Sequence, residues 1–254
     1  MKAKDLKTKA PNICIWGNVD SGKTALVAQA AGGYIIDTDD GMWTIKSLKD
    51  KFFELRQQVE FDTFIDVFPN PPKAFLNIKR KLLEISRLQA ENKWPFDFFA
   101  LDSLTGLAKA VRYHIMGTVP PDKHSETDVF AVPQLKHYNF MTTAMDSLLA
   151  IMRSFKTPVI LTAHETIIET DDSIMIKIKS VTKPHGMNEI PWQFDEIWHA
   201  KKKPAGGNDF NYVVGPSPSV AISTRSRSGF KEIVHNEIGL AGVLAKIGYI
   251  YEPK

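Results

Sequence analysis

The chain has one cysteine, no long apolar run and almost no excess of charge. Among its 254 residues the single cysteine, Cys14, excludes an intrachain disulfide and a zinc site built from several cysteines. No apolar stretch approaches the roughly 18 residues that suggest a membrane span, so we expect no membrane partner. The formal net charge of +3 permits a nucleic-acid partner without requiring one. These absences favour a cytoplasmic protein.

Apolar runs of strand length alternate with helix-like segments over the first two thirds of the chain. Strands are expected at 11–16, 33–41, 61–68, 96–103 and 157–164, with helical segments between them. This alternation predicts an α/β fold with a mostly parallel central sheet flanked by helices. From residue 165 the pattern changes to short β-like stretches. We expect one domain over residues 1–254, with a basic tail at 1–10 and a β-rich C-terminal part of the same domain at 165–254.

A glycine-rich stretch follows the first apolar run directly. Gly17, Gly22, Lys23 and Thr24 match the spacing Gly-x-x-x-x-Gly-Lys-[Ser/Thr] of a phosphate-binding loop, or P-loop. In such a loop, backbone N–H groups surround the phosphates and the start of the next helix adds partial positive charge. The lysine reaches the β and γ phosphates, and the threonine hydroxyl binds magnesium. The predicted nucleotide-binding residues are Gly17, Asn18, Val19, Asp20, Ser21, Gly22, Lys23, Thr24 and Ala25.

A P-loop needs a second carboxylate to position magnesium, and this group commonly ends a neighbouring apolar strand. Asp102 stands at the end of the run FFALDS and fits this role. We therefore predict that Thr24 and Asp102 hold Mg²⁺. The alternative is that Asp102 only caps the following helix, because Asp and Ser are both good capping residues.

Three further segments occur in a fixed order along the chain: IIDTDDG at 35–41, DSLTGL at 102–107 and LTAH at 161–164. Together with GNVDSGKT at 17–24 they resemble the RecA-type recombinase core. Within that group the chain is most similar to the short phage RecA-like ATPases, which include single-strand annealing and recombination proteins. The resemblance covers roughly residues 11–230. It implies a RecA-like P-loop NTPase core that binds ATP and Mg²⁺ and hydrolyses ATP.

The resemblance also implies catalytic roles for Lys23 and for two side chains outside the P-loop. Asp39 occupies the place of the general base that polarises the attacking water, where the family usually has glutamate. Asp40 is the alternative base. A further alternative is that the acidic stretch at 37–40 is only a polar turn. His164 falls where recombinases usually have a glutamine that senses the γ-phosphate. A neutral imidazole can donate one hydrogen bond to a phosphate. The alternative is a structural histidine at the end of a strand.

Two arginines near the C-terminus, Arg225 and Arg227, stand two residues apart in STRSRSGF, on the same side of an expected strand. In the RecA family, basic residues at this spacing reach the γ-phosphate of a neighbouring subunit. Cations at that position stabilise the charge of the phosphoryl transition state. Two solvated arginines on an edge strand are the alternative.

The resemblance assigns single-stranded DNA to two loops, at residues 113–128 and 165–190. In the second loop, Lys177, Lys179 and Lys183 are candidate DNA-binding residues, and lysines at 201–203 follow another strand. Such cations would neutralise phosphates, while Trp192, Phe194 or Trp198 could stack on bases. The alternative is that the lysines are solvated or protect a sheet edge, and that the tryptophans belong to the core.

The sequence therefore favours an ATPase, stimulated by DNA, that acts on single-stranded DNA in phage recombination or strand annealing. The resemblance suggests a homo-oligomer. Only ten residues precede the first strand, where full-length recombinases have a polymerisation helix, so we expect rings or DNA-dependent oligomers or the help of a partner. A single-strand-binding protein is a candidate partner. One alternative is an ATPase that supports helicase loading, replication or packaging. A nucleotide switch with negligible hydrolysis and a small-molecule kinase are the others.

Overall fold

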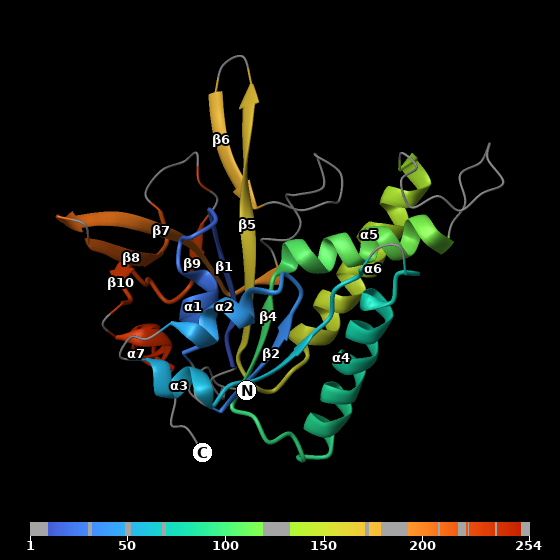
Figure 1. Ribbon diagram of the computed structural model, residues 1–254, viewed down its shortest axis with the longest axis horizontal. Helices are drawn as coiled ribbons and strands as arrows, with labels where there is room; N and C mark the ends of the chain where they lie inside the picture. The colour runs from blue at the N-terminus through green and yellow to red at the C-terminus, as the bar shows by residue number, and fades with distance from the viewer. Residues whose placement is uncertain are drawn as a thin grey trace, which may run out of the picture.

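The apolar run before the phosphate loop forms the central strand of the computed structural model, β1 (Asn12–Gly17), which is buried along its whole length (Figure 1). Alternate side chains of a strand face opposite sides of its sheet. Accordingly, Cys14 and Trp16 join one hydrophobic core, whereas Ile13 and Ile15 join the other. The structure describes residues 10–29, 32–48, 52–67, 70–118, 133–170, 173–178, 193–207, 209–217, 222, 224–236 and 238–249.

The strands of the described residues form a sheet around β1. The others are β2 (Gly33–Asp37), β3 (Glu60–Thr63), β4 (Phe98–Asp102), β5 (Val159–Thr170), β6 (Ser173–Ile178), β7 (Glu196–Gly206), β8 (Asp209–Gly215), β9 (Arg225–Ser226) and β10 (Ile233–Val234). The main order is β10-β8-β7-β1-β5-β4-β2-β3, with β6 beside β5 and β9 beside β7. From β7 to β3 neighbouring strands are parallel, and β6, β8, β9 and β10 pair antiparallel. This arrangement confirms the predicted α/β fold with a β-rich C-terminal extension.

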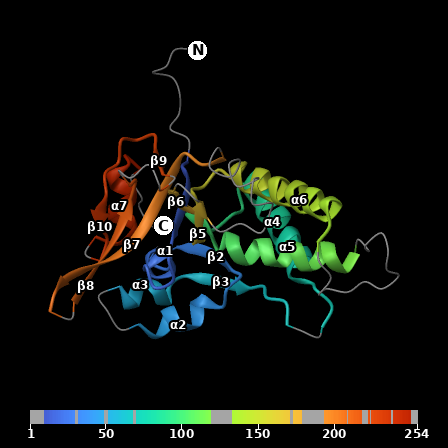
Figure 2. The ribbon, with the colours of Figure 1, turned by 90° about the horizontal axis from the view of Figure 1, so that it is seen from above.

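Helices cover both faces of the sheet (Figure 2). One face packs against α4 (Ala74–Ala90), α5 (Leu104–Thr118) and α6 (Leu135–Arg153). The other packs against α1 (Lys23–Val27), α2 (Gly41–Ser47) and α7 (Gly239–Lys246), and α3 (Phe53–Gln57) follows α2. Burial on both faces explains why the inner strands read as continuous apolar runs. Within the described residues, no helix has the length and apolar character needed to cross a membrane.

The strand that carries Asp102 is not the direct neighbour of the P-loop strand. β5 lies between β1 and β4, and its His164 pairs with Gly17 at the end of β1. The expectation of an adjoining strand is therefore wrong. The carboxyl ends of parallel strands nevertheless meet at one edge of the sheet, so the loop after β1, the end of β4 and the middle of β5 come together there.

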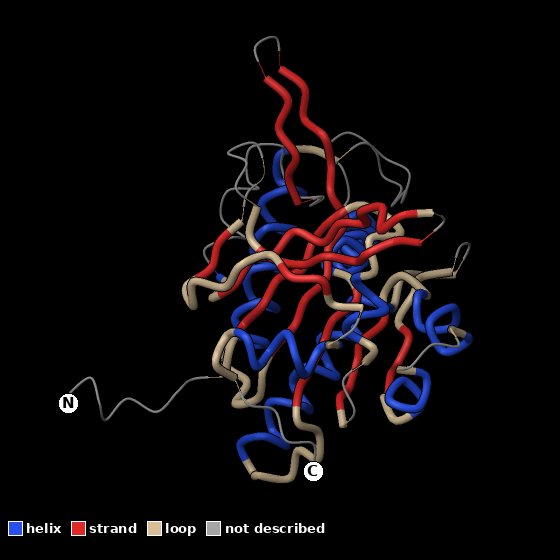
Figure 3. Tube along the Cα trace, turned by 90° about the vertical axis from the view of Figure 1, so that its left-hand side faces the viewer, coloured by secondary structure: helices blue, strands red, loops and turns tan. Residues whose placement is uncertain are grey.

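Beyond His164, β5 leaves the sheet and pairs antiparallel with β6, from Glu165 opposite Ile178 to Thr170 opposite Ser173. This β5–β6 hairpin projects away from the body of the molecule (Figures 1 and 3). The alternating apolar and basic residues of the sequence thus form part of a β-hairpin. Its position is important for the site, because the strand that enters the hairpin also carries His164.

Candidate functional site

The loop between β1 and α1 holds the Lys23 side chain in a cage of neutral oxygens. The ammonium group donates hydrogen bonds to the backbone carbonyl oxygens of Gly17 at 3.0 Å and Asn18 at 2.6 Å, and to Ser21 Oγ at 3.1 Å. Burial lowers the pKa of Lys23 to about 8, and the nearby carboxylates offset only part of this effect. A buried cation held by dipoles alone is suited to an anionic ligand.

Two glycines of the loop are required by close contacts. Gly22 has a φ of 81°, a left-handed conformation that favours glycine, and a Cβ there would lie 2.7 Å from the Tyr212 ring. A Cβ on Gly17 would lie 2.3 Å from the carbonyl oxygen of Ala200 on β7. Among the described residues, no side chain caps α1 at Gly22, which leaves its first N–H groups available to an anion.

Asp102, at the end of β4, has the properties of a magnesium ligand. Its side chain is 3% exposed, and its Oδ1 accepts a hydrogen bond from the Thr162 hydroxyl. Its Oδ2 has no hydrogen-bond partner among the described residues. Burial raises the pKa of Asp102 and outweighs the favourable interactions with the hydroxyl groups of Thr162 and Thr24. An unpaired carboxylate oxygen at this depth needs a cation.

The Thr24 hydroxyl lies beside this carboxylate. A Cβ built on Gly41 would be 3.4 Å from Asp102 Oδ2 and 3.6 Å from Thr24 Oγ1, so both oxygens border one small space. Mg²⁺ prefers oxygen ligands and is usually bound by one or two protein groups together with substrate phosphates. The residues therefore fit Mg²⁺ bound with a nucleotide.

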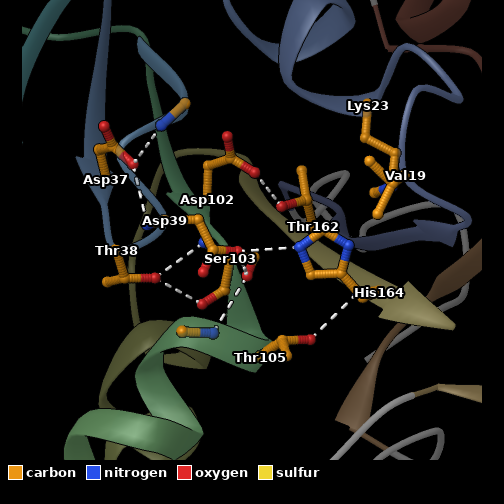
Figure 4. A network of polar contacts seen from close by, with 12 residues as sticks. Val19, Lys23, Asp37, Thr38, Asp39, Asp102, Ser103, Thr105, Thr162 and His164 are labelled. Atoms are coloured by element: carbon orange, nitrogen blue, oxygen red, sulfur yellow. Dashed lines mark hydrogen bonds and ion pairs between the residues drawn. The ribbon is translucent and has the colours of Figure 1, made fainter. Parts of the chain in front are cut away.

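Asp39 and His164 are in direct contact (Figure 4). His164 Nε2 lies 3.0 Å from Asp39 Oδ2, and the Ser103 hydroxyl donates to the same oxygen. Although burial alone would raise the pKa of Asp39, these hydrogen bonds from His164 and Ser103 hold it below its usual range. Asp39 is therefore ionised at neutral pH, and His164 Nε2 acts as the donor.

Asp39 approaches the start of α5 closely from its other side. A Cβ on Gly106 would lie 2.8 Å from Asp39 Oδ1 and 2.4 Å from Thr38 Oγ1, so this position of DSLTGL requires a residue without a side chain. The backbone N–H of His164 donates to Thr105 Oγ1 at 3.0 Å. The turn after β2, the start of α5 and the middle of β5 are thus joined by polar contacts.

The carboxylate of Asp37 organises this turn, a role that the sequence analysis did not identify. It is fully buried and accepts the backbone N–H groups of Asp39 at 3.1 Å and of Gly41 and Met42 at 3.3 Å each. Its signal in the sequence is its place as the first acid after an apolar run. Asp40 is exposed, whereas Asp39 lines the cavity at the P-loop.

One cavity of about 960 Å³ is bordered by the side chains and loop described above. Its wall includes the P-loop from Val19 to Ala25, together with Asp39, Asp102 and His164. Ligand pockets commonly have volumes of about 300–1,000 Å³, so the cavity can hold a whole nucleotide. The structure thus brings together the predicted P-loop, Asp102, Asp39 and His164.

The two arginines lie elsewhere. Arg225 on β9 pairs with Ile197 of β7. The residue of β7 that pairs with Gly17 at the start of the P-loop is Ala200, about 10 Å farther along the strand. Neither Arg225 nor Arg227 borders the cavity of its own chain. Their role toward a neighbouring subunit therefore stays a prediction.

The expectation that both arginines share one strand is wrong. β9 ends at Ser226, because the Glu196 carboxylate accepts the backbone N–H groups of Arg227 at 3.0 Å and Ser228 at 2.9 Å and draws the chain into a turn. The Arg227 guanidinium instead donates to Asp195 Oδ1 at 2.7 Å.

The candidate DNA-binding lysines are mostly beyond the described structure. Lys177 belongs to β6, but its side chain, like all of Lys179 and Lys183, lies outside the described residues. The lysines at 201–203 are engaged in ion pairs. Lys201 and Lys203 pair with Glu232, and Lys202 Nζ lies 2.6 Å from Asp20 Oδ2.

The aromatic residues proposed to stack on bases do not face solvent where they are described. Trp198 is 0% exposed and Phe194 is 2% exposed, because both pack in the two cores of the sheet. The stacking prediction is therefore wrong for these two, and Trp192 lies outside the described residues. The alternative, that the aromatic residues belong to the core, is confirmed for Phe194 and Trp198.

Comparison with known proteins agrees with this geometry. The chain matches the family described as AAA domain over residues 9–228, which is more than half of its length. No curated protein gives a significant match. The matched region contains the P-loop, the Asp102 strand and the His164 strand. The chain therefore belongs to the AAA domain family of P-loop ATPases.

Proposed function

We propose that this P-loop ATPase binds single-stranded DNA and uses ATP hydrolysis in phage recombination or strand annealing. The observation that supports this proposal is the course of β5. His164 in the middle of β5 contacts Asp39 at the nucleotide site, and the same strand continues into the projecting β5–β6 hairpin. A change at the phosphates can therefore reach the hairpin through a single strand.

In the proposed reaction, the first N–H groups of α1 and the Lys23 ammonium hold the phosphates. Thr24 and Asp102 would hold Mg²⁺, which neutralises charge on the phosphates when bound. Asp39 is ionised, and its hydrogen bonds from Ser103 and His164 are both made to Oδ2. A lone pair of this carboxylate that neither donor uses would accept a proton of the attacking water. A shorter carboxylate than glutamate suggests that turnover is slow.

His164 connects the nucleotide state to the hairpin. A γ-phosphate within reach competes with Asp39 for the N–H of His164, because a neutral imidazole has one donor. When the phosphate takes this hydrogen bond, the ring leaves Asp39, and the backbone of β5 moves with it. Phosphate release restores the contact with Asp39. The hairpin thereby has two positions that differ with the bound nucleotide.

The test is ATP hydrolysis with and without single-stranded DNA at low and moderate salt. We expect single-stranded DNA to increase turnover, less so at moderate salt, because phosphate contacts weaken as salt rises. A variant with residues 167–176 replaced by a two-residue turn should keep its basal turnover and lose the stimulation. Lys23→Ala is the control that should lose both. Equal turnover with and without any nucleic acid would refute the proposal.

A second candidate is a nucleotide switch, or an ATPase that supports helicase loading, replication or packaging with little direct DNA binding. Two observations favour it: the Asp39 carboxylate is short and already held by two donors, and the lysines at 201–203 are all engaged in ion pairs. This candidate predicts tight ATP binding, slow hydrolysis and no response to DNA. The same assay separates the two.

The proposed assembly is a homo-oligomer in which Arg225 and Arg227 face the nucleotide of the adjacent subunit. Their distance from the cavity of their own chain supports a role in trans over one in cis. Arg227 would exchange its ion pair with Asp195 for the phosphate of the neighbour. A single-strand-binding protein remains a candidate partner of this assembly.

A further inference from the structure

The cavity extends well beyond the phosphate loop. Its wall continues from Lys23, Thr24 and Ala25 of α1 to Gln29, two residues beyond the end of that helix. Past the phosphates it is bordered on one side by Ile45 and Leu48 of the α2 segment. Neither the P-loop nor the magnesium ligands explain this second half.

Three chain segments meet where Gln29 and Phe52 line the cavity. A Cβ on Gly239, at the start of α7, would lie 2.8 Å from the Phe52 ring and 3.2 Å from Gln29 Oε1. The ring of Tyr212 packs on Gly22, which joins this end to the P-loop. Phe52, Ile45 and Leu48 give the space apolar walls of the kind that hold a flat heterocycle.

Two buried side chains in this wall carry polar atoms that have no hydrogen-bond partner among the described residues. His235 is 2% exposed, and neither of its ring nitrogens has a hydrogen-bond partner in the described part of the chain; the same is true of Gln29 Oε1. Burial lowers the pKa of His235 to about 4, so at pH 7 its neutral ring offers one donor and one acceptor. Leaving such groups unpaired is costly, which points to a ligand.

The neighbouring Asn236 serves as an internal comparison. Its Oδ1 accepts the backbone N–H of Tyr212 at 2.6 Å, and its Nδ2 donates to the carbonyl oxygen of Phe210 at 2.9 Å. Both ends of this amide hold β8 to the segment before α7. By contrast, the two ring nitrogens of His235 and the Oε1 of Gln29 have no hydrogen-bond partner among the described residues.

We propose that His235 and Gln29 hydrogen-bond the base of the bound nucleotide, and that this base is adenine. Gln29 Oε1 is an acceptor and suits the exocyclic amino group of adenine, whereas guanine would place a carbonyl oxygen there. His235 contacts a ring nitrogen of the same base. This inference rests on nucleotide binding at the P-loop and adds residues that select the nucleotide.

The test measures binding of three probes, Mg-ATP, Mg-GTP and magnesium tripolyphosphate, by calorimetry. The variants are His235→Phe, which keeps an aromatic ring without nitrogens, and Gln29→Leu, which keeps the approximate volume without the amide. His114→Phe is the matched control, because His114 is a partly buried histidine that packs on Phe75 and does not line the cavity. Thermal unfolding establishes that each variant is folded.

We expect His235→Phe and Gln29→Leu each to weaken ATP binding about tenfold, as when one buried neutral hydrogen bond is lost. Binding of tripolyphosphate should not change, and Gln29→Leu should also lose the preference for ATP over GTP. ATP binding by His235→Phe equal to that of the wild type would overturn the inference. If this variant does not fold, Gln29→Leu decides, and a retained preference for ATP overturns it.

The failure of this inference differs from the failure of the proposed nucleotide site. A wild-type protein that binds neither ATP nor tripolyphosphate has no nucleotide site at the P-loop. If the wild-type protein binds both probes, and the two variants bind them with the same affinities, the P-loop site exists but other groups recognise the base.

Discussion

Asp102→Asn should stabilise the protein in the absence of metal while removing its response to magnesium and ATP. In the wild type, burial raises the pKa of Asp102 above its unfolded value of 3.8. The protonated carboxyl therefore favours the folded state at pH values below 3.8, and this stabilisation is lost as the pH rises through the folded pKa. At pH 7 the raised pKa therefore corresponds to a cost in stability, because this carboxyl is harder to ionise in the folded state than in the unfolded state. Asparagine does not titrate, and its carbonyl oxygen can still accept the Thr162 hydroxyl.

The size of the effect follows from the unpaired Oδ2. Leaving a buried polar group unsatisfied costs about 1–3 kcal/mol, and each kcal/mol shifts the unfolding temperature by about 2–4 °C for a chain of this size. We therefore expect Asp102→Asn without metal to unfold about 2 to 12 °C higher than the wild type at pH 7. The difference should shrink as pH falls toward 3.8, because the wild-type carboxyl is then protonated as well.

The assay is thermal unfolding from acid to neutral pH, with and without Mg-ATP. Ligand that binds the folded state raises wild-type stability by about 2.7 kcal/mol at one hundred times its dissociation constant, and Asp102→Asn should lose most of this gain. Asp209→Asn is the control, since Asp209 is exposed on β8 and should change neither quantity. An unfolding temperature at or below that of the wild type without metal, or an undiminished gain from Mg-ATP, would refute the assignment of Asp102.

Three further predictions concern the same site. Because the pKa of Lys23 is about 8 without ligand, the protein should take up about half a proton when it binds Mg-ATP at pH 8. Calorimetry in buffers of different ionisation enthalpy measures this uptake, and no uptake would mean that Lys23 does not contact the phosphates. His164→Ala removes a hydrogen bond that lowers the pKa of Asp39, so the acid limb of the rate profile should move to higher pH, and an unmoved limb would separate His164 from the base. Arg225→Ala and Arg227→Ala should reduce turnover by about a thousandfold with ATP affinity retained, and mixing with Lys23→Ala should restore turnover; lost affinity would contradict a role in trans.

The sequence predicts the phosphate-binding part of the site better than the part of the cavity at Gln29 and His235. The P-loop spacing is local, so Lys23 and Thr24 could be placed from eight consecutive residues. Asp102 could be found because a buried strand that ends in a carboxylate has few uses beside a P-loop. The resemblance then assigned Asp39 and His164 to the nucleotide site as general base and γ-phosphate sensor, although it did not predict that these two side chains contact each other.

The remaining parts of the site depend on long-range contacts. Asp37 organises its turn through three backbone N–H groups, and a string of acids does not reveal which member is buried. Gly239 meets Gln29 only because α7 returns to the segment after α1, more than two hundred residues later in the chain. The position of β5 between β1 and β4 is likewise a property of the crossover connections. Such features follow from packing, which no local pattern encodes.

The most direct test of the central claim is a crystal structure with a non-hydrolysable ATP analogue and Mg²⁺. We predict phosphates against the N–H groups of residues 20–25, the metal between Thr24 Oγ1 and Asp102, and the base beside His235. A nucleotide bound elsewhere, or a metal that does not contact Asp102, would contradict the account.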